Sequence, residues 1–166
     1  YAPNAKIGLH ASAWATKMDV SMNKNPSFDV AGEATKVATF LGECGGKESD
    51  LIVESVTTGG LRSVLKRLVE IAPRLSVPIV LTSKGIEQKT HMITPDVVCD
   101  VFGPSAVDNV AMLSGPSFAA EVSRHLPTAV VCGGTNPAVC DKVVSVFTSQ
   151  LFRVYPNSDV RGVAYG

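Results

Sequence analysis

The sequence predicts an α/β fold of the doubly wound kind, in which a mainly parallel sheet carries helices on both faces. Three observations lead to this expectation. Short apolar runs alternate with segments whose apolar residues recur at helical spacing. Most of these runs are apolar throughout, as in strands that are buried on both faces. Hydrophobic residues make up 45% of the chain and charged residues 18%, which suits a globular protein with one core.

Five strands are expected from residue 51 onward. Each is a short run of mainly apolar residues, and Gly, Pro, Ser or Asn residues lie close to its ends. The expected strands are residues 51–56, 77–83, 109–114, 128–133 and 151–156. The first 50 residues give a weaker pattern, in which 8–14 and 34–40 are strand candidates.

Helices are expected between these strands. The first places Leu61, Val64, Leu65, Leu68, Ile71 and Ala72 on one stripe, with Arg62, Lys66, Arg67 and Glu70 opposite. The next, within 90–103, has Pro95 in its first turn and Gly103 beyond its end. A third is expected to begin with Pro116 at its first position, and a fourth lies within 136–150.

Composition excludes several classes of function. The 166 residues carry 15 basic and 15 acidic side chains, so charge gives no reason to expect nucleic acid or a membrane surface as a partner. No apolar run approaches the ~18 residues of a membrane span, and no leader pattern is present. The cysteines, Cys44, Cys99, Cys132 and Cys140, match no zinc or redox spacing. Reduced thiols in a cytoplasmic protein are expected, with a disulfide as the alternative.

A lysine stands at the mouth of a buried strand, in the stretch Ser83-Lys84-Gly85. Ligands of open parallel sheets bind beyond the carboxyl ends of the strands. A charge there favours an anionic ligand, and Gly85 lets the chain turn and lets a ligand approach the backbone. The alternative is a surface lysine whose stem lies along apolar residues while its charge stays in water.

A second candidate follows the strand at 109–114. Ser114 and Gly115 end this strand, and the expected helix begins at Pro116. The free N–H groups of a first helical turn favour an anion such as phosphate, and Ser117 adds a hydroxyl. The alternative is an ordinary connection between a strand and a helix. After 51–56, Thr57 or Thr58 is expected to cap the next helix.

Other motifs give no support for a site. The stretch around Gly46 lacks the first glycine and the Ser or Thr of a phosphate-binding loop. No G-x-G-x-x-G occurs, and the three histidines lack metal-ligand spacing.

From Asp50 onward the chain resembles NAD(P)-dependent glycerol-3-phosphate dehydrogenase of the bacterial biosynthetic type. Within that family its sequence most resembles chlamydial-type sequences. Five stretches carry the resemblance, in the order and at the spacing of the family: DLIVESVTTGGLRSVL, PIVLTSKGIEQKT, LSGPSFAAEV, LPTAVV and FRVYPNSDVRGVAYG. The first 49 residues fit more loosely, through GLHASAWATKMDV and NKNPS.

The resemblance implies a Rossmann-like fold and a partial N-terminal NAD(P)-binding domain over residues 1–166. The first strand and its glycine-rich loop would precede Tyr1, and a helical substrate domain would follow Gly166. The family's proton-transfer lysine would also lie beyond Gly166, so no catalytic proton donor is expected within the chain, and the chain by itself is expected to be inactive.

Residue roles follow from the same resemblance. Lys84 corresponds to a lysine that contacts both substrate and cofactor, Gly115 and Ser117 to substrate-binding positions, and Ala119 to a cofactor-binding position. Thr16 and Lys17 stand near the adenosine 2′ position, where no acidic residue ends the strand. This favours NADP, or use of both NADP and NAD.

The implied reaction interconverts dihydroxyacetone phosphate and sn-glycerol 3-phosphate by hydride transfer, for glycerophospholipid biosynthesis. No metal is expected, and the family resemblance leaves a homodimer open. Two alternatives remain: another dehydrogenase of the same build acting on a hydroxy acid, and a non-catalytic nucleotide-binding fragment.

Overall fold

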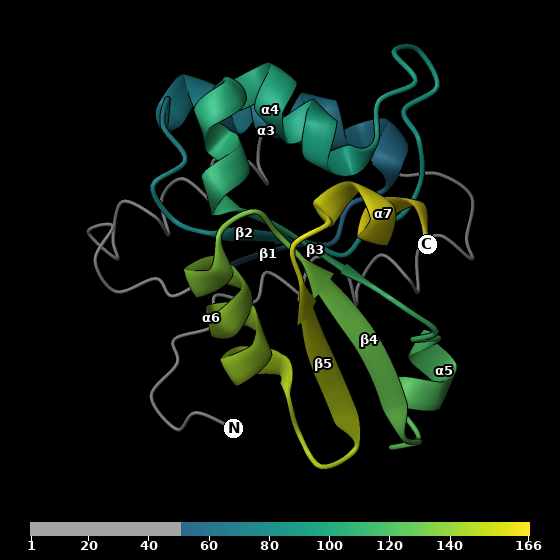
Figure 1. The fold of residues 1–166 in the computed structure, drawn as a ribbon. Coiled ribbons are helices and arrows are strands. Elements are labelled where there is room, and N and C mark those ends of the chain that lie inside the picture. The colour runs from purple at the N-terminus through teal and green to yellow at the C-terminus, as the bar shows by residue number, and fades with distance from the viewer. Residues whose placement is uncertain (1–50) are drawn as a thin grey trace.

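The computed structural model describes residues 51–166, which form a five-stranded sheet with the strand order β1-β2-β3-β4-β5 (Figure 1). Strands β1 to β3 pair in parallel, β4 pairs antiparallel to β3, and β5 runs parallel to β4. The expected doubly wound, mainly parallel sheet is therefore confirmed. The strands are β1 (Ile52–Glu54), β2 (Ile79–Leu81), β3 (Val110–Ser114), β4 (Thr128–Gly133) and β5 (Phe152–Asn157).

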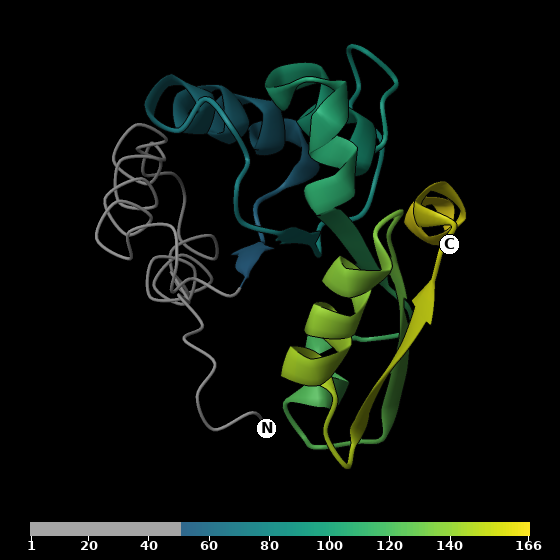
Figure 2. The same ribbon diagram turned by 60° about the vertical axis from the view of Figure 1, so that its left-hand side comes forward.

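Helices cover both faces of the sheet, also as expected (Figure 2). Helices α3, α4 and α7 contribute to the core on one face, and α6 packs on the other. The helical segments are α3 (Thr58–Ile71), α4 (Thr94–Phe102), the 3-10 helix η1 (Pro104–Asn109), α5 (Ala119–Val122), α6 (Pro137–Phe147) and α7 (Val160–Tyr165).

The alternation of side chains along β3 divides the core into two layers. Ala111 and Leu113 point to the side covered by α6, whereas Val110 and Met112 point to the side covered by α3 and α4. All five residues of β3 are buried, because both faces of this strand are covered. This explains why its sequence is apolar without alternation.

Two expected helices match closely. Pro95 lies in the first turn of α4, and Gly103 ends that helix with a φ of 94°. In α6, the Asn136 side chain accepts a hydrogen bond from the Ala138 N–H and caps the first turn.

The expectation for the segment after β3 was wrong in part. Helix α5 begins at Ala119 and has four residues, so Pro116 lies outside it. The Ser117 N–H donates to the Gly115 carbonyl at 2.8 Å, and this tight turn occupies the chain before the helix can start. The proposed anion site at a helix N-terminus beginning at Pro116 is therefore not formed.

Helix α7 was not expected. Its N-cap is Asp159, whose carboxylate accepts a hydrogen bond from the Gly162 N–H. The six-residue segment is too short to show a helical period, although the aspartate directly before Val160 was a usable N-cap signal.

Within residues 51–166 no helix is both long and apolar enough to cross a membrane. Cys99, Cys132 and Cys140 are free thiols, as expected, and Cys44 lies outside the described residues. The strand candidates 8–14 and 34–40 also lie outside them.

Candidate functional site

The carboxyl ends of β1, β2 and β3 meet at one edge of the sheet, because these strands are parallel and in register at Glu54, Leu81 and Met112. Lys84 follows β2, and Gly115 follows β3. The Lys84 ammonium donates a hydrogen bond of 2.7 Å to the Gly115 carbonyl. The structure thus brings together two of the residues that the sequence singled out.

Lys84 is exposed, but its side chain is directed by this bond and not free in water. Within residues 51–166, no carboxylate lies within ion-pair distance of its ammonium group. An ammonium group has three donors, and the contact with Gly115 uses one of them. The remaining donors can therefore bind an anionic or carbonyl oxygen.

Gly85 permits the turn that follows Lys84. Its φ is 129°, a conformation that side chains rarely adopt, and a Cβ there would lie 3.2 Å from the Thr58 Oγ1. The same hydroxyl donates a hydrogen bond of 2.9 Å to the Lys84 carbonyl. The backbone at Lys84 is therefore fixed against the start of α3.

The expected capping role of the threonines is corrected in its detail. Thr57 is the N-cap residue of α3, and its carbonyl accepts from Gly60 and Leu61, but its side chain makes no capping bond. Thr58 is the first helical residue, and its hydroxyl goes to Lys84 instead.

Glu54 is a buried carboxyl group that the sequence analysis missed. It lies at the end of β1 and accepts hydrogen bonds from the Ser83 Oγ at 2.8 Å and from the Val56 N–H at 2.7 Å. Burial raises its pKa, and these hydrogen bonds oppose that shift. An acidic residue within an apolar strand was the available signal. The carboxyl group ties the end of β1 to the residue before Lys84.

Arg62, expected opposite the apolar stripe of its helix, is paired with carboxylates of neighbouring segments. Its guanidinium binds both oxygens of Glu87, with Nε to Oε1 at 2.8 Å and Nη2 to Oε2 at 2.9 Å. It also contacts Asp100 on α4. These hydrogen bonds lower the pKa of Glu87 and raise that of Arg62. The side chain faces the loop that follows β2. The helical period alone does not predict this contact, because it carries no information on neighbouring segments.

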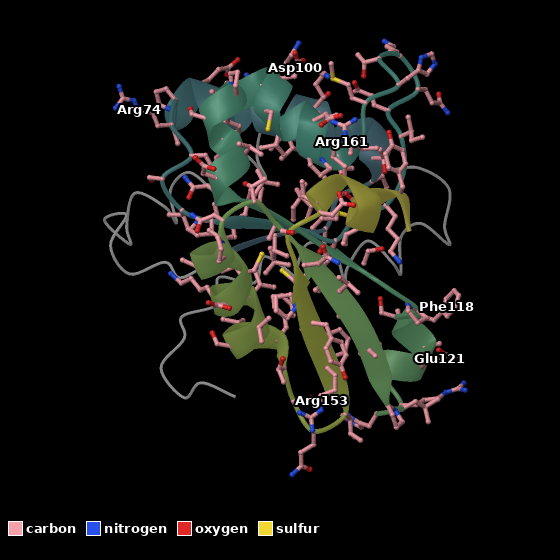
Figure 3. The ribbon with its side chains drawn as sticks, viewed as in Figure 1. Arg74, Asp100, Phe118, Glu121, Arg153 and Arg161 are labelled. Carbon is pink, nitrogen blue, oxygen red and sulfur yellow. The ribbon has the colours of Figure 1, made fainter. Side chains whose placement is uncertain are left out.

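Gly115 turns the chain at the end of β3. Its φ is 153°, and an added Cβ would lie 2.9 Å from the Val130 Cα, so the turn packs tightly on β4. Ser117 and Ala119 follow in the same exposed segment, and Ser117 contacts the Gly115 carbonyl. Figure 3 shows Phe118 and Glu121 of this segment at the periphery of the molecule. Thr16 and Lys17 lie outside the described residues.

A cavity of about 310 Å³ opens beside this turn. It is lined by Ser114, Gly115, Val131, Asn157, Asp159, Gly162, Val163 and Gly166. The Ser114 hydroxyl is buried, and no hydrogen-bond partner for it exists among residues 51–166. Ser114 continues the alternation of Val110 and Met112, so it points to the face that α7 covers. A polar ligand in the cavity can supply the missing partner.

Gly115 connects two features that can bind polar groups of a small molecule. Its carbonyl accepts the hydrogen bond from the Lys84 ammonium, and the residue also lines the cavity that contains the unpaired Ser114 hydroxyl. Lys84 itself does not line that cavity. Within residues 51–166, no cluster of side chains could hold a metal ion.

Comparison with known proteins identifies the family of this chain. Residues 35–140 match the sequence model of the family described as NAD-dependent glycerol-3-phosphate dehydrogenase N-terminus. Glycerol-3-phosphate dehydrogenase [NAD(P)+] of Protochlamydia amoebophila is 42% identical over 168 aligned positions, which cover 98% of this chain and 50% of that protein. The enzyme of the same name from Chlamydia muridarum is 45% identical over 70% of this chain and 34% of its own length. The chain therefore spans half or less of these relatives.

A solved structure shows the same fold. The crystal structure of glycerol-3-phosphate dehydrogenase from Coxiella burnetii superposes with a TM-score of 0.63 at 27% identity, over 77% of this chain and 36% of that one.

Proposed function

The chain belongs to the NAD-dependent glycerol-3-phosphate dehydrogenase family, and from this premise we propose that the gene product carrying it interconverts dihydroxyacetone phosphate and sn-glycerol 3-phosphate, using NAD or NADP. The observation that carries the proposal is the hydrogen bond between the Lys84 ammonium and the Gly115 carbonyl. It holds a positive charge at the edge of the sheet where the carboxyl ends of β1, β2 and β3 lie. That edge is where ligands of doubly wound folds bind.

The residues along this edge fit a nicotinamide dinucleotide. The Thr82 hydroxyl donates to the Glu54 carbonyl at 2.6 Å and lies 2.9 Å from the Ser55 hydroxyl, which therefore donates to it. Each hydroxyl oxygen can still accept a hydrogen bond from a ribose hydroxyl or the amide of a cofactor. Lys84 stands beside them, and Ala119, Thr16 and Lys17 are the further cofactor positions that we propose. When bound, the dinucleotide supplies or accepts the hydride.

The protein's own contribution is positioning and charge. Lys84 places its ammonium beside the substrate carbonyl oxygen, where negative charge develops as the carbonyl is reduced. Gly115 and Ser117 orient the substrate, and Ser114 offers its unpaired hydroxyl. Because the Lys84 ammonium is already in place, no reorganisation of the protein is needed when negative charge develops on the substrate oxygen. The ammonium therefore stabilises the transition state more than the ground state.

The wider role follows from the substrate. We propose that the product feeds glycerophospholipid synthesis in the cytoplasm, and that the gene product acts as a homodimer without nucleic acid. Sedimentation of the complete gene product tests the dimer.

The test of the activity is a reductase assay of the complete gene product. NADH and NADPH oxidation are followed with dihydroxyacetone phosphate and, in parallel, with pyruvate and oxaloacetate. Turnover with dihydroxyacetone phosphate, and little with the 2-oxo acids, is the expected result. Preference for a 2-oxo acid would identify a hydroxy-acid dehydrogenase instead. Binding of cofactor without any turnover would identify a non-catalytic nucleotide-binding protein.

A further inference from the structure

Two side chains on one face of α3 contact the loop that follows β2. Thr58 and Arg62 are four residues apart, so they lie one above the other on the helix surface. Thr58 binds the Lys84 carbonyl, and Arg62 binds the Glu87 carboxylate. Helix α3 therefore contacts the loop at two points that flank Gly85 and Ile86.

The contact at Thr58 acts directly on Lys84. Its hydroxyl donates to the Lys84 carbonyl at 2.9 Å, and it also lies against Gly85, whose backbone only a glycine adopts readily. The hydrogen bond to the Lys84 carbonyl and the contact with Gly85 together restrain the orientation of the peptide between these two residues. The direction in which the lysine side chain leaves the backbone depends on that orientation.

The contact at Arg62 is a fork that binds both carboxylate oxygens. Pairs of this kind combine charge with fixed geometry. The side chains of Arg62 and Glu87 are 20% and 11% exposed, so water screens the pair only in part. The guanidinium also reaches Asp100 and the Met92 sulfur, which joins α3, the loop and α4.

Glu87 is in turn fixed within the loop. Its N–H donates to the Met92 carbonyl and its carbonyl accepts from the His91 N–H, both at 2.8 Å. Ile86 and Ile93 form an isolated β-bridge, and Thr90 donates to the Glu87 carboxylate. These contacts join the two ends of the segment 86–93. The pairing of Glu87 with Arg62 therefore restrains the whole loop that begins at Lys84.

We propose that Thr58 and Arg62 are positioning residues that clamp the Lys84–Glu87 segment to α3 and thereby hold the Lys84 ammonium at the end of β3. The consequence for turnover rests on the function proposed above, whereas the effect on Lys84 itself does not. A lysine stem has four flexible carbons, so a fixed backbone narrows the region that its charge can occupy.

The first test measures Lys84 directly in the complete gene product. Lysine labelled with ¹³C at Cε is incorporated, and the Lys84 signal is assigned by its loss in Lys84→Arg. A held side chain gives a signal away from those of the exposed Lys66 and Lys89. In Thr58→Val and in Arg62→Met, the Lys84 signal is expected to move to the position of these exposed lysines.

Matched controls separate positioning from general damage. Thr58→Ser keeps the hydroxyl and is expected to keep the wild-type signal, and Arg67→Met removes an exposed arginine from the same helix. An unchanged Lys84 signal in both Thr58→Val and Arg62→Met would overturn the proposal.

The second test is kinetic. Thr58→Val is expected to lower kcat with dihydroxyacetone phosphate by about tenfold, with less than about a twofold change in KM for the dinucleotide, and Thr58→Ser is expected to restore kcat. A moved Lys84 signal in a protein that does not reduce dihydroxyacetone phosphate would support the clamp and reject the function. A moved signal with unchanged kcat would overturn the clamp's role in turnover.

Discussion

The ammonium group of Lys84 lies 2.7 Å from the carbonyl oxygen of Gly115, so a side chain from the end of β2 reaches the end of β3. The two residues are 31 positions apart in the sequence. Their meeting depends on the parallel pairing of β2 and β3, which brings both carboxyl ends to one edge.

Gly115→Ala is expected to destabilise the protein. The residue has a φ of 153°, and the new Cβ would lie 2.9 Å from the Val130 Cα, so we expect a loss of about 1–3 kcal/mol in the free energy of unfolding. Urea denaturation measures this loss. The matched control is Gly59→Ala, where a Cβ would meet nothing within 4 Å. Equal stability of the two variants would contradict the packing described for Gly115.

Ser114→Ala is expected to separate stability from binding. The buried hydroxyl has no partner among residues 51–166, so its removal is expected to leave the free energy of unfolding unchanged or to raise it by about 1 kcal/mol. Binding of dihydroxyacetone phosphate, measured by calorimetry with the cofactor present, is expected to weaken. Ser145→Ala on the surface of α6 is the control. Unchanged binding in Ser114→Ala would show that the hydroxyl does not meet the substrate.

Glu54→Gln is expected to change how stability depends on pH. Burial raises the pKa of Glu54 in the folded protein above the ordinary value of 4.5. The folded state then holds a proton that the unfolded state has lost, so the free energy of unfolding falls as the pH rises from about 4.5 through the raised pKa. Glutamine removes this titration.

Urea denaturation at about pH 5 and about pH 8 tests the Glu54 prediction. The variant is expected to gain stability relative to the wild type at the higher pH, and Glu121→Gln controls for the loss of one exposed negative charge. A difference between Glu54→Gln and the wild type that does not change with pH would contradict the account.

Cys132 and Cys140 are expected to resist alkylation in the native protein. Both are buried, and burial raises the pKa of Cys132 to about 12. The thiolate is the reactive form, so both should react more slowly with iodoacetamide than the half-buried Cys99, and at similar rates after unfolding. Mass-spectrometric peptide mapping measures the rates. Native alkylation of Cys132 as fast as that of Cys99 would contradict the described core.

The sheet could be predicted from the sequence because its strands are short apolar runs, and such runs are informative where both faces are buried. The contact between Lys84 and Gly115 was not predicted as such, although both residues were identified as candidates from their places after strands. Glu54 was missed because a single carboxyl group within an apolar run looks like part of the strand. Its role depends on Ser83, which only the fold brings beside it.

Local patterns left two features open or wrong. Helical periodicity placed Arg62 opposite the apolar stripe of its helix but could not show that a loop there supplies its partner Glu87. The preference of proline for a first helical turn placed the start of the third expected helix at Pro116, whereas α5 begins at Ala119. The turn at Gly115 depends on packing against β4, which no local pattern contains.

In the function proposed for this chain, the Lys84 charge assists the reduction of dihydroxyacetone phosphate. The most direct measurement is kcat/KM of the complete gene product and of Lys84→Ala, with Lys89→Ala as the control from the same loop. The account predicts that Lys84→Ala lowers kcat/KM by about 10²–10³-fold or more, because a preorganised donor to developing charge is lost, and that Lys89→Ala leaves it unchanged. A loss in Lys84→Ala of less than about tenfold, which is about 1.4 kcal/mol of transition-state stabilisation, would contradict it.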